Sequence, residues 1–167
     1  MKNAGTLENP SEYSLLERAE DIVYITDSQG RLTWMNRNAR GLNRGKAEAL
    51  LGGPLDPLIL EEDLPKVKQS LERALKGQPQ HCDARVTGKK GDVLLLSINT
   101  TPIYREGKVD GTLNIARDVT GVKRLQERLR ESEEKYRTLV DKSPDGIYVF
   151  QDDMFKLCNR KFIEESG

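Results

Sequence analysis

DIVYITDSQGRLTWMNR, residues 21–37, contains two short runs of β-branched and aromatic residues. Such runs are typical of strands, and the intervening tetrapeptide DSQG, residues 27–30, favours a tight reversal of the chain. The stretch therefore predicts a β-hairpin. Before it, Ser14 and Glu17 have the spacing of a capping box, which predicts a short amphipathic helix ending near Asp21.

Beyond the hairpin, the pattern predicts one long helix and three further strands. Segment 38–60 contains glycines and prolines that prevent a long helix, so we expect short helical turns there. Segment 62–76 predicts a helix, because its apolar residues recur on one face. Turn signals then separate three runs that predict antiparallel strands, at 81–88, 92–103 and 110–119. Since helices and strands do not alternate regularly, the fold class is α+β.

The chain also repeats its own opening. Residues 139–160 align with residues 15–37 when Gly30 is left unmatched. In this alignment Asp21 matches Asp145, Tyr24 matches Tyr148, and Asn36 matches Asn159. A second copy of the hairpin thus begins near residue 139, and we expect the sequence to be a fragment of a longer protein.

The amino-acid composition indicates which kinds of binding partner and which cellular compartment to expect. The 167 residues are 36% hydrophobic and 32% charged, with 27 basic and 27 acidic side chains, so a nucleic-acid partner is not expected. We find no signal-peptide pattern and no apolar run long enough for a membrane segment, and we expect a cytoplasmic protein. Cys82 and Cys158 stand alone, which fits reduced thiols rather than a disulfide or a zinc site.

The order and spacing of these pieces resemble a PAS domain followed by the start of another. The resemblance rests on the hairpin, the helix, the last three strands, and the tripeptide Asp118-Val119-Thr120, which is similar to the D-[IV]-T signature that closes such domains. It implies a five-stranded antiparallel sheet of order 2-1-5-4-3, with the helical middle across one face to enclose a pocket. It also implies a sensory, dimerising module.

The resemblance and the repeat together divide the chain into four segments. We expect an N-terminal extension over residues 1–13, a PAS domain over 14–120, a coiled-coil linker helix over 121–138, and a truncated start of a second PAS domain over 139–167.

Strand alternation and the resemblance identify candidate pocket residues. Alternate residues of a strand share one face of the sheet. The candidates are Tyr24, Thr26, Leu96, Ile98, Thr100, Asn114 and Ala116, together with Trp34. Buried polar groups need partners, which a ligand, ordered water or mutual hydrogen bonds can supply. Trp34 could stack on a planar cofactor, but a large aromatic residue in a hairpin is more often a core or dimer contact.

The resemblance also argues against two cofactors. In haem-binding PAS domains the iron ligand is a His on the long helix, but segment 62–76 contains none, and we expect His81 to be exposed. In light-oxygen-voltage domains the reactive Cys would fall at Leu55, and polar flavin contacts would fall at Leu96 and Ala116. Haem and a covalently reacting flavin are therefore disfavoured, a non-covalently bound flavin stays open, and the identity of any cofactor stays unknown. No catalytic set of residues is found.

Residues 119–140 predict a signalling helix that pairs in a homodimer. Its seam positions alternate at spacings of three and four: Val122, Leu125, Leu129, Ser132, Tyr136 and Leu139. Asp118 can cap this helix and Thr120 lies in its first turn, so we assign signal transmission to Asp118, Thr120, Leu125 and Leu129. A solvated spacer helix is the alternative.

These observations favour a cytoplasmic sensory and dimerisation module of a multidomain signalling protein, such as a sensor histidine kinase or diguanylate cyclase. The module would relay the state of a small-molecule ligand or of its own conformation to a downstream output domain. The alternative is a ligand-free relay whose pocket is filled by its own side chains.

Overall fold

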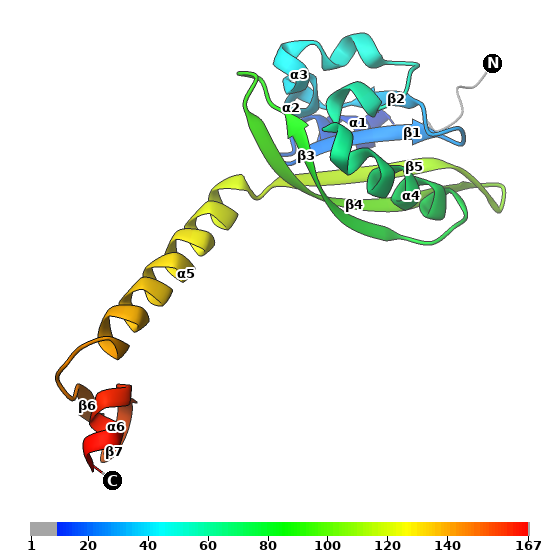
Figure 1. Ribbon diagram of the computed structural model, residues 1–167. Helices are drawn as coiled ribbons and strands as arrows, with labels where there is room; N and C mark the ends of the chain where they lie inside the picture. The colour runs from blue at the N-terminus through cyan, green and yellow to red at the C-terminus, as the bar shows by residue number, and fades with distance from the viewer. Residues whose placement is uncertain (1–9, 167) are drawn as a thin grey trace. The chain divides into compact units, whose positions relative to one another are not determined.

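A computed structural model of the chain describes residues 10–166 and divides between Thr120 and Gly121 into two compact units (Figure 1). The first unit contains a five-stranded antiparallel sheet with strand order β2-β1-β5-β4-β3. Its strands are β1 (Ile22–Asp27), β2 (Leu32–Met35), β3 (Gln80–Thr87), β4 (Val93–Arg105) and β5 (Lys108–Asp118). This confirms the α+β class and the strand order expected from the sequence.

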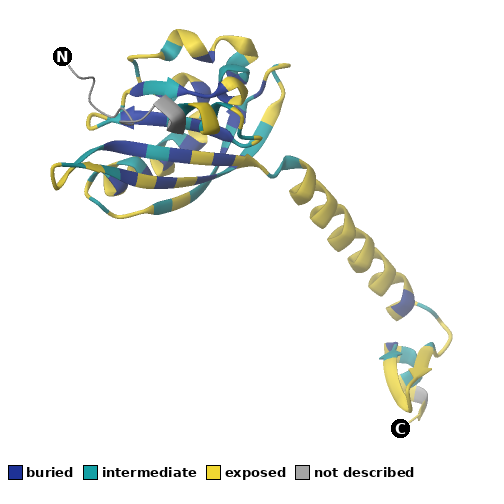
Figure 2. Ribbon diagram, turned by 180° about the vertical axis from the view of Figure 1, so that it is seen from behind, coloured by how far each residue is buried: buried dark blue, intermediate teal, exposed yellow. Residues whose placement is uncertain are grey.

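Helices lie on both faces of this sheet. The four α-helices of the first unit are α1 (Pro10–Glu17), α2 (Arg37–Arg40), α3 (Leu42–Gly45) and α4 (Leu64–Leu75), and three 3-10 turns are η1 (Ala47–Leu50), η2 (Asp56–Leu58) and η3 (Glu61–Asp63). Figures 1 and 2 show α2, α3 and α4 on one face, which we call the inner face, and α1 on the other. The short turns and the long helix are where the sequence predicted them.

The first helix differs from its prediction. It begins at Pro10 and ends at Glu17, so Ser14 lies inside it and is not its N-cap. A proline is well tolerated in the first turn, where the backbone N–H has no helical partner. With Ser14 as N-cap the helix would begin at Leu15, so it begins five residues earlier than the capping box indicated, and it ends at Glu17 rather than near Asp21. Of the expected extension over residues 1–13, the first nine residues lie outside the described part of the chain.

Register across the sheet places alternate residues in rows. Tyr24 pairs with Asn114, which pairs with Thr100, and these three residues form one row of the inner face. Strand β1 is central to the packing, because Val23 and Ile25 on the opposite face are also buried. The predicted period of two is thus confirmed, and β1 buries both of its faces.

A single buried asparagine joins the hairpin to the helices around it. Asn36 Oδ1 accepts hydrogen bonds from the backbone N–H groups of Val23, at 3.1 Å, and Ala39, at 3.0 Å. Its Nδ2 donates to the carbonyl oxygens of Asp21, at 2.9 Å, and Leu16, at 3.3 Å. One side chain therefore connects the end of α1, strand β1 and the start of α2.

The second unit repeats this arrangement on a smaller scale. It contains most of helix α5 (Thr120–Asp141), then strands β6 (Tyr148–Gln151) and β7 (Met154–Cys158), which form a two-stranded sheet, and helix α6 (Arg160–Ser166). Within residues 10–166 we find no helix with the length and apolar character needed to cross a membrane.

Asn159 occupies the position that Asn36 occupies in the first unit. Its Oδ1 accepts from the N–H groups of Ile147, at 2.8 Å, and Phe162, at 2.9 Å. Its Nδ2 donates to the carbonyl oxygens of Val140 and Asp145, both at 2.9 Å. Each partner is the residue that the sequence repeat aligns with a partner of Asn36, so the alignment of the two hairpins holds for individual hydrogen bonds.

Candidate functional site

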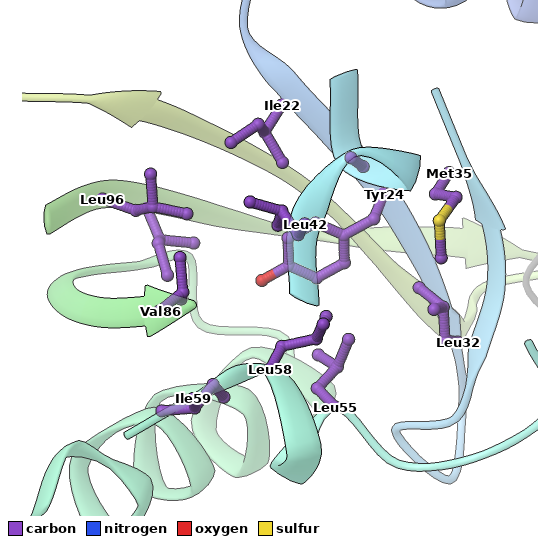
Figure 3. A pocket seen from close by; sticks show the side chains of 12 residues that line it. Ile22, Tyr24, Leu32, Met35, Leu42, Leu55, Leu58, Ile59, Val86 and Leu96 are labelled. Atoms are coloured by element: carbon purple, nitrogen blue, oxygen red, sulfur yellow. The ribbon is translucent and has the colours of Figure 1, made fainter. Parts of the chain in front are cut away.

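A cavity of about 30 Å³ lies between the inner face of the sheet and the helical segment that follows the first hairpin. The first two strands and β4 contribute Ile22, Tyr24, Leu32, Met35, Leu96 and Ile98 to its wall (Figure 3). The rest of the wall consists of Ala39, Leu42, Leu55, Leu58 and Ile59, with Val86 from β3. Such a space holds one or two water molecules, whereas pockets for drug-sized ligands are roughly ten times larger or more. The centre of the domain is thus an apolar core with a small void.

Seven of the eight predicted pocket residues lie on the inner face. Tyr24, Leu96 and Ile98 lie on the cavity wall itself. The other four, Thr26, Thr100, Asn114 and Ala116, are buried on the same face of their strands but outside that wall. The interior position of Asn114, which is 2% exposed, is confirmed. Contact between any of these residues and a ligand stays a prediction.

Two polar members of this set, Thr26 and Asn114, bond to Thr112, which is buried on the same face. The hydroxyl groups of Thr26 and Thr112 are 2.7 Å apart and share a hydrogen bond. Asn114 Nδ2 donates to Thr112 Oγ1 at 2.8 Å and lies 3.4 Å from the carbonyl oxygen of Tyr24. Mutual bonding is one of the three ways expected to satisfy buried polar groups, and it operates here.

Tyr24 differs from these residues because its polar group faces the cavity. Figure 3 shows its ring among the lining side chains, with the hydroxyl pointing away from β1. Burial raises the pKa of this hydroxyl well above its ordinary value, and the neighbouring Cys82 thiol adds to the shift. The group therefore stays neutral and can both donate and accept a hydrogen bond.

Trp34 lies outside the cavity wall. It pairs with Ile25, so its side chain is on the opposite face of the sheet from Tyr24. There its ring lies 5.2 Å from the ring of Tyr13 on α1, measured between ring centroids. A register shift between Ile25 and Thr26 interrupts the alternation of the hairpin at this point. The sequence pattern did not show this shift.

The sequence-based candidates include three of the twelve wall residues and miss the other nine. Leu42, Leu55, Leu58 and Ile59 come from a segment of short turns, where neither a period of 2 nor a period of 3.6 indicates which residues point inward. The available signal was the apolar content of the run PLDPLIL, residues 54–60, between two glycines and an acidic pair.

The exit from the sheet into α5 is fixed by short-range hydrogen bonds. Asp118 Oδ1 accepts from the N–H of Thr120 at 2.9 Å, so it caps the first residue of the helix, as expected. The Thr120 hydroxyl in turn accepts from the N–H of Leu95 on β4 at 2.8 Å. The N–H of Val119 donates to the carbonyl oxygen of Leu95 at 2.9 Å. Thr120, the first residue of α5, is therefore bonded directly to β4.

The seam side chains of α5 are exposed. Figure 2 shows almost the whole helix as exposed surface. The apolar seam residues have these exposed fractions: Val122 57%, Leu125 67%, Leu129 62%, Tyr136 58% and Leu139 64%. More than half of each of these side chains is exposed, so no other segment of the described chain packs against this apolar stripe of seam residues.

The side chains that could bind a metal ion or react with a cofactor do not form a cluster in the described part of the chain. His81 is exposed, as predicted, and its Nδ1 lies 3.1 Å from Asn99 Oδ1. Burial raises the pKa of the Cys82 thiol, which disfavours its reactive thiolate form. Within residues 10–166, no group of three or more His, Cys, Asp or Glu side chains is placed to hold a metal ion.

Comparison with known families agrees with this geometry. A family model described as PAS fold matches residues 16–124, which is more than half of the sequence. The chain therefore belongs to the PAS family. A second model, described as PAS domain, matches residues 134–167, the segment that repeats the first hairpin.

Individual relatives extend the comparison. The chain is 26% identical over 153 residues to a phytochrome from Picea abies, in an alignment that covers 87% of this chain and 13% of the phytochrome. The chain thus spans a small part of that protein's length. The PAS domain of a protein from Colwellia psychrerythraea has a TM-score of 0.58 and 24% identity, covering 66% of this chain and 96% of that domain.

A domain of a sensory box sensor histidine kinase/response regulator from Geobacter sulfurreducens is also similar. Its TM-score is 0.54 at 24% identity, covering 65% of this chain and 91% of that domain. Identities at this level show a shared fold.

Proposed function

We propose that this chain is a sensory and dimerisation module of a multidomain signal-transduction protein, and that it relays its state through α5. A sensor histidine kinase is the favoured whole protein, since a similar domain occurs in the Geobacter sensor histidine kinase. In this proposal a PAS domain over residues 14–120 is followed by a linker helix over 121–138 and a second PAS domain from residue 139. Catalysis belongs to an output domain elsewhere, and the free thiols suit the reducing cytoplasm.

The observation that carries the proposal is the exposed apolar stripe on α5. Leucines that are 62–67% exposed on a 22-residue helix leave apolar area in contact with water. Their alternating spacing of three and four matches the a and d positions of a two-stranded coiled coil. A second copy of the same helix is the partner that this spacing fits.

Charges beside the stripe favour a parallel pair. With Leu125 at a d position, Arg128 falls at g and Glu133 at the following e. In a parallel coiled coil, g of one helix faces the next e of the other, so Arg128 attracts Glu133 of the second copy. The parallel arrangement also places the two exit junctions at the same end of the pair.

The junction connects this pair to the sheet. Because the Thr120 hydroxyl bonds to the N–H of Leu95 on β4, a displacement of β4 relative to β5 acts on the first residue of α5. In this proposal a change of state in the domain reaches the helix at that residue. Asp118 and Thr120 act as transmission residues in this proposal, and Leu125 and Leu129 hold the two helices together.

Light scattering tests the proposal. Changing Leu125 and Leu129 together to Lys should convert a dimer into a monomer, because the charges would be buried in the seam. The matched control is Glu131→Gln with Thr138→Lys, which changes net charge by the same amount on the outward side of the helix. We expect the control to remain dimeric. A dimer that survives the double Lys change would place the association elsewhere.

A ligand-free relay is the second candidate, and two observations favour it. The cavity has a volume of about 30 Å³, and Thr26 and Asn114 form hydrogen bonds within the domain. Native mass spectrometry, compared with the denatured mass, separates the two versions. A bound molecule would appear as extra mass in the native spectrum, whereas a self-filled core would show the mass of the protein alone.

A further inference from the structure

The cavity wall has one polar group among apolar neighbours. Of the twelve side chains that line the cavity, that of Tyr24 alone carries a hydroxyl, amide or charged group. Within residues 10–166, its hydroxyl has no hydrogen-bond partner, while Thr26, Thr112 and Asn114 are bonded to one another. Tyr24 is half-buried and its hydroxyl faces the cavity, so a molecule in the cavity would supply the missing hydrogen-bond partner.

We propose that the cavity binds a small uncharged apolar molecule with a single hydrogen-bonding group, which bonds to the hydroxyl of Tyr24. This inference rests on the proposed sensory function and specifies the class of its ligand. A charged ligand is unfavourable because the wall has no charge to compensate for its desolvation. A ligand with several polar edges would leave all but one of them unbonded against aliphatic side chains.

The structure also indicates the route of entry. A groove of about 280 Å³ lies outside the cavity, between α4 and the segment around η2. Leu55 and Ile59 line both the groove and the cavity, so these two side chains separate the two spaces. Movement of Leu55 and Ile59 away from the core would join the spaces and make room for a ring.

An ion pair holds this segment against α4. Lys68 Nζ lies 2.5 Å from Asp56 Oδ2, and both side chains are partly exposed. On its other side the segment is held by the bridge between Ile59 and Val86 and by a 3.0 Å hydrogen bond from the N–H of Leu60 to the carbonyl oxygen of Arg85. The Lys68 pair can therefore act as a latch that opens without breaking the sheet.

Fluorine NMR with three probes of similar shape tests the ligand class. The probes are 4-fluorophenol, 4-fluorotoluene and 4-fluorobenzoate, which differ in one substituent. Wild-type protein should bind 4-fluorophenol about three- to tenfold more tightly than 4-fluorotoluene, because of one additional hydrogen bond. It should not bind 4-fluorobenzoate at the same concentrations.

The Tyr24→Phe variant should lose the preference for 4-fluorophenol while still binding 4-fluorotoluene. Tyr104→Phe is the matched control, since the Tyr104 hydroxyl is exposed near Gly77 and away from the cavity; it should keep the preference. Retained preference in Tyr24→Phe, binding of 4-fluorobenzoate equal to the neutral probes, or no binding of any probe would overturn the inference.

The same spectra test the latch. Lys68→Met should increase the exchange rate of 4-fluorophenol about two- to fivefold, the effect expected from loss of one exposed ion pair. Lys76→Met, at the exposed end of α4, should leave the rate unchanged. An unchanged rate in Lys68→Met would refute the latch. If no probe binds but the double Lys variant of α5 is monomeric, the ligand inference fails while the dimeric relay stands.

Discussion

Asn36 and Asn159 make equivalent hydrogen bonds in two hairpins whose apolar residues have different surroundings. In the first hairpin Ile25, Leu32 and Met35 are at most 2% exposed. In the second, Tyr148 and Phe155 are 54% and 58% exposed. The bonds around each asparagine are local, whereas burial of the apolar residues requires the other strands and helices of a full domain. The comparison shows that the hairpin motif is specified locally and stabilised by distant segments.

The turns differ as well. Asp27 Oδ1 accepts from the N–H groups of Gln29 and Arg31, both at 2.9 Å, and Gly30 has a positive φ of 77°. In the second hairpin, Asp152 and Asp153 both have positive φ, at 51° and 55°, as in a two-residue type I′ turn. The second hairpin reverses with one residue fewer, which explains why Gly30 is unmatched in the repeat.

The two hairpins also differ in what packs against them. A Cβ at Gly30 would lie 2.9 Å from Leu71 Cδ2, so α4 packs closely on the first turn. In the second unit, three aromatic rings of the hairpin and one of α6 contact one another, with Phe155 5.8 Å from Tyr148 and 5.1 Å from Phe150 between centroids. Phe162 lies 4.8 Å from Tyr148. Aromatic stacking thus partly replaces the missing core.

The largest expected effect comes from removing the first asparagine. Asn36→Ala should lower the free energy of unfolding by about 3–4 kcal/mol, because several buried backbone groups lose their partner. Urea unfolding followed by the fluorescence of Trp34, the only tryptophan, measures the first unit alone. The matched control is Asn159→Ala, which should leave this transition unchanged. Equal loss in both variants would show that the two units unfold together.

A second prediction concerns the hydrogen bonds between Asp63, which precedes α4, and Arg85 on β3. Asp63 accepts three hydrogen bonds from Arg85, at 2.7, 2.9 and 3.2 Å, and these bonds hold the pKa of the carboxyl well below its ordinary value. The carboxylate therefore stabilises the fold above the unfolded-state pKa of about 3.9, and this contribution is lost as the pH falls through the lower folded-state value. At about pH 7, Asp63→Asn should cost roughly 2 kcal/mol.

The difference between wild type and Asp63→Asn should shrink as the pH is lowered below about 4. Urea unfolding at neutral and acidic pH measures it. Asp56→Asn is the control, because it removes an exposed ion pair and should cost less than about 1 kcal/mol. An Asp63→Asn deficit that is the same at both pH values would contradict the role of the carboxylate charge.

The smallest effect is expected from shortening the chain. Truncation after residue 140 removes the second hairpin, and the stability of the first unit should change by no more than about 0.5 kcal/mol. Thermal unfolding followed by Trp34 fluorescence measures this. A loss of several kcal/mol would mean that residues 141–167 complete the core of the first unit.

The sequence predicted those parts of the fold that have a regular period. Alternation placed Asn114 and Leu96 in the interior, and the apolar spacing of α4 gave its position within two residues. The sequence-based prediction failed where local geometry interrupts the regular alternation of residues. The shift beside Ile25 put Trp34 on the other face, and irregular turns concealed Leu55 and Ile59 in the cavity wall. The cavity wall was thus predicted in part on its strands and missed in its turns.

Disulfide cross-linking shows directly whether α5 pairs in parallel with a second copy of itself. In a Cys82→Ala, Cys158→Ala background, Leu125→Cys places a thiol at a d position, where the same residue of both helices meets within disulfide distance. Glu131→Cys places a thiol on the outward side. We expect rapid dimer formation by Leu125→Cys and little by Glu131→Cys on a non-reducing gel. Equal cross-linking of both variants, or none by Leu125→Cys, would contradict this pairing.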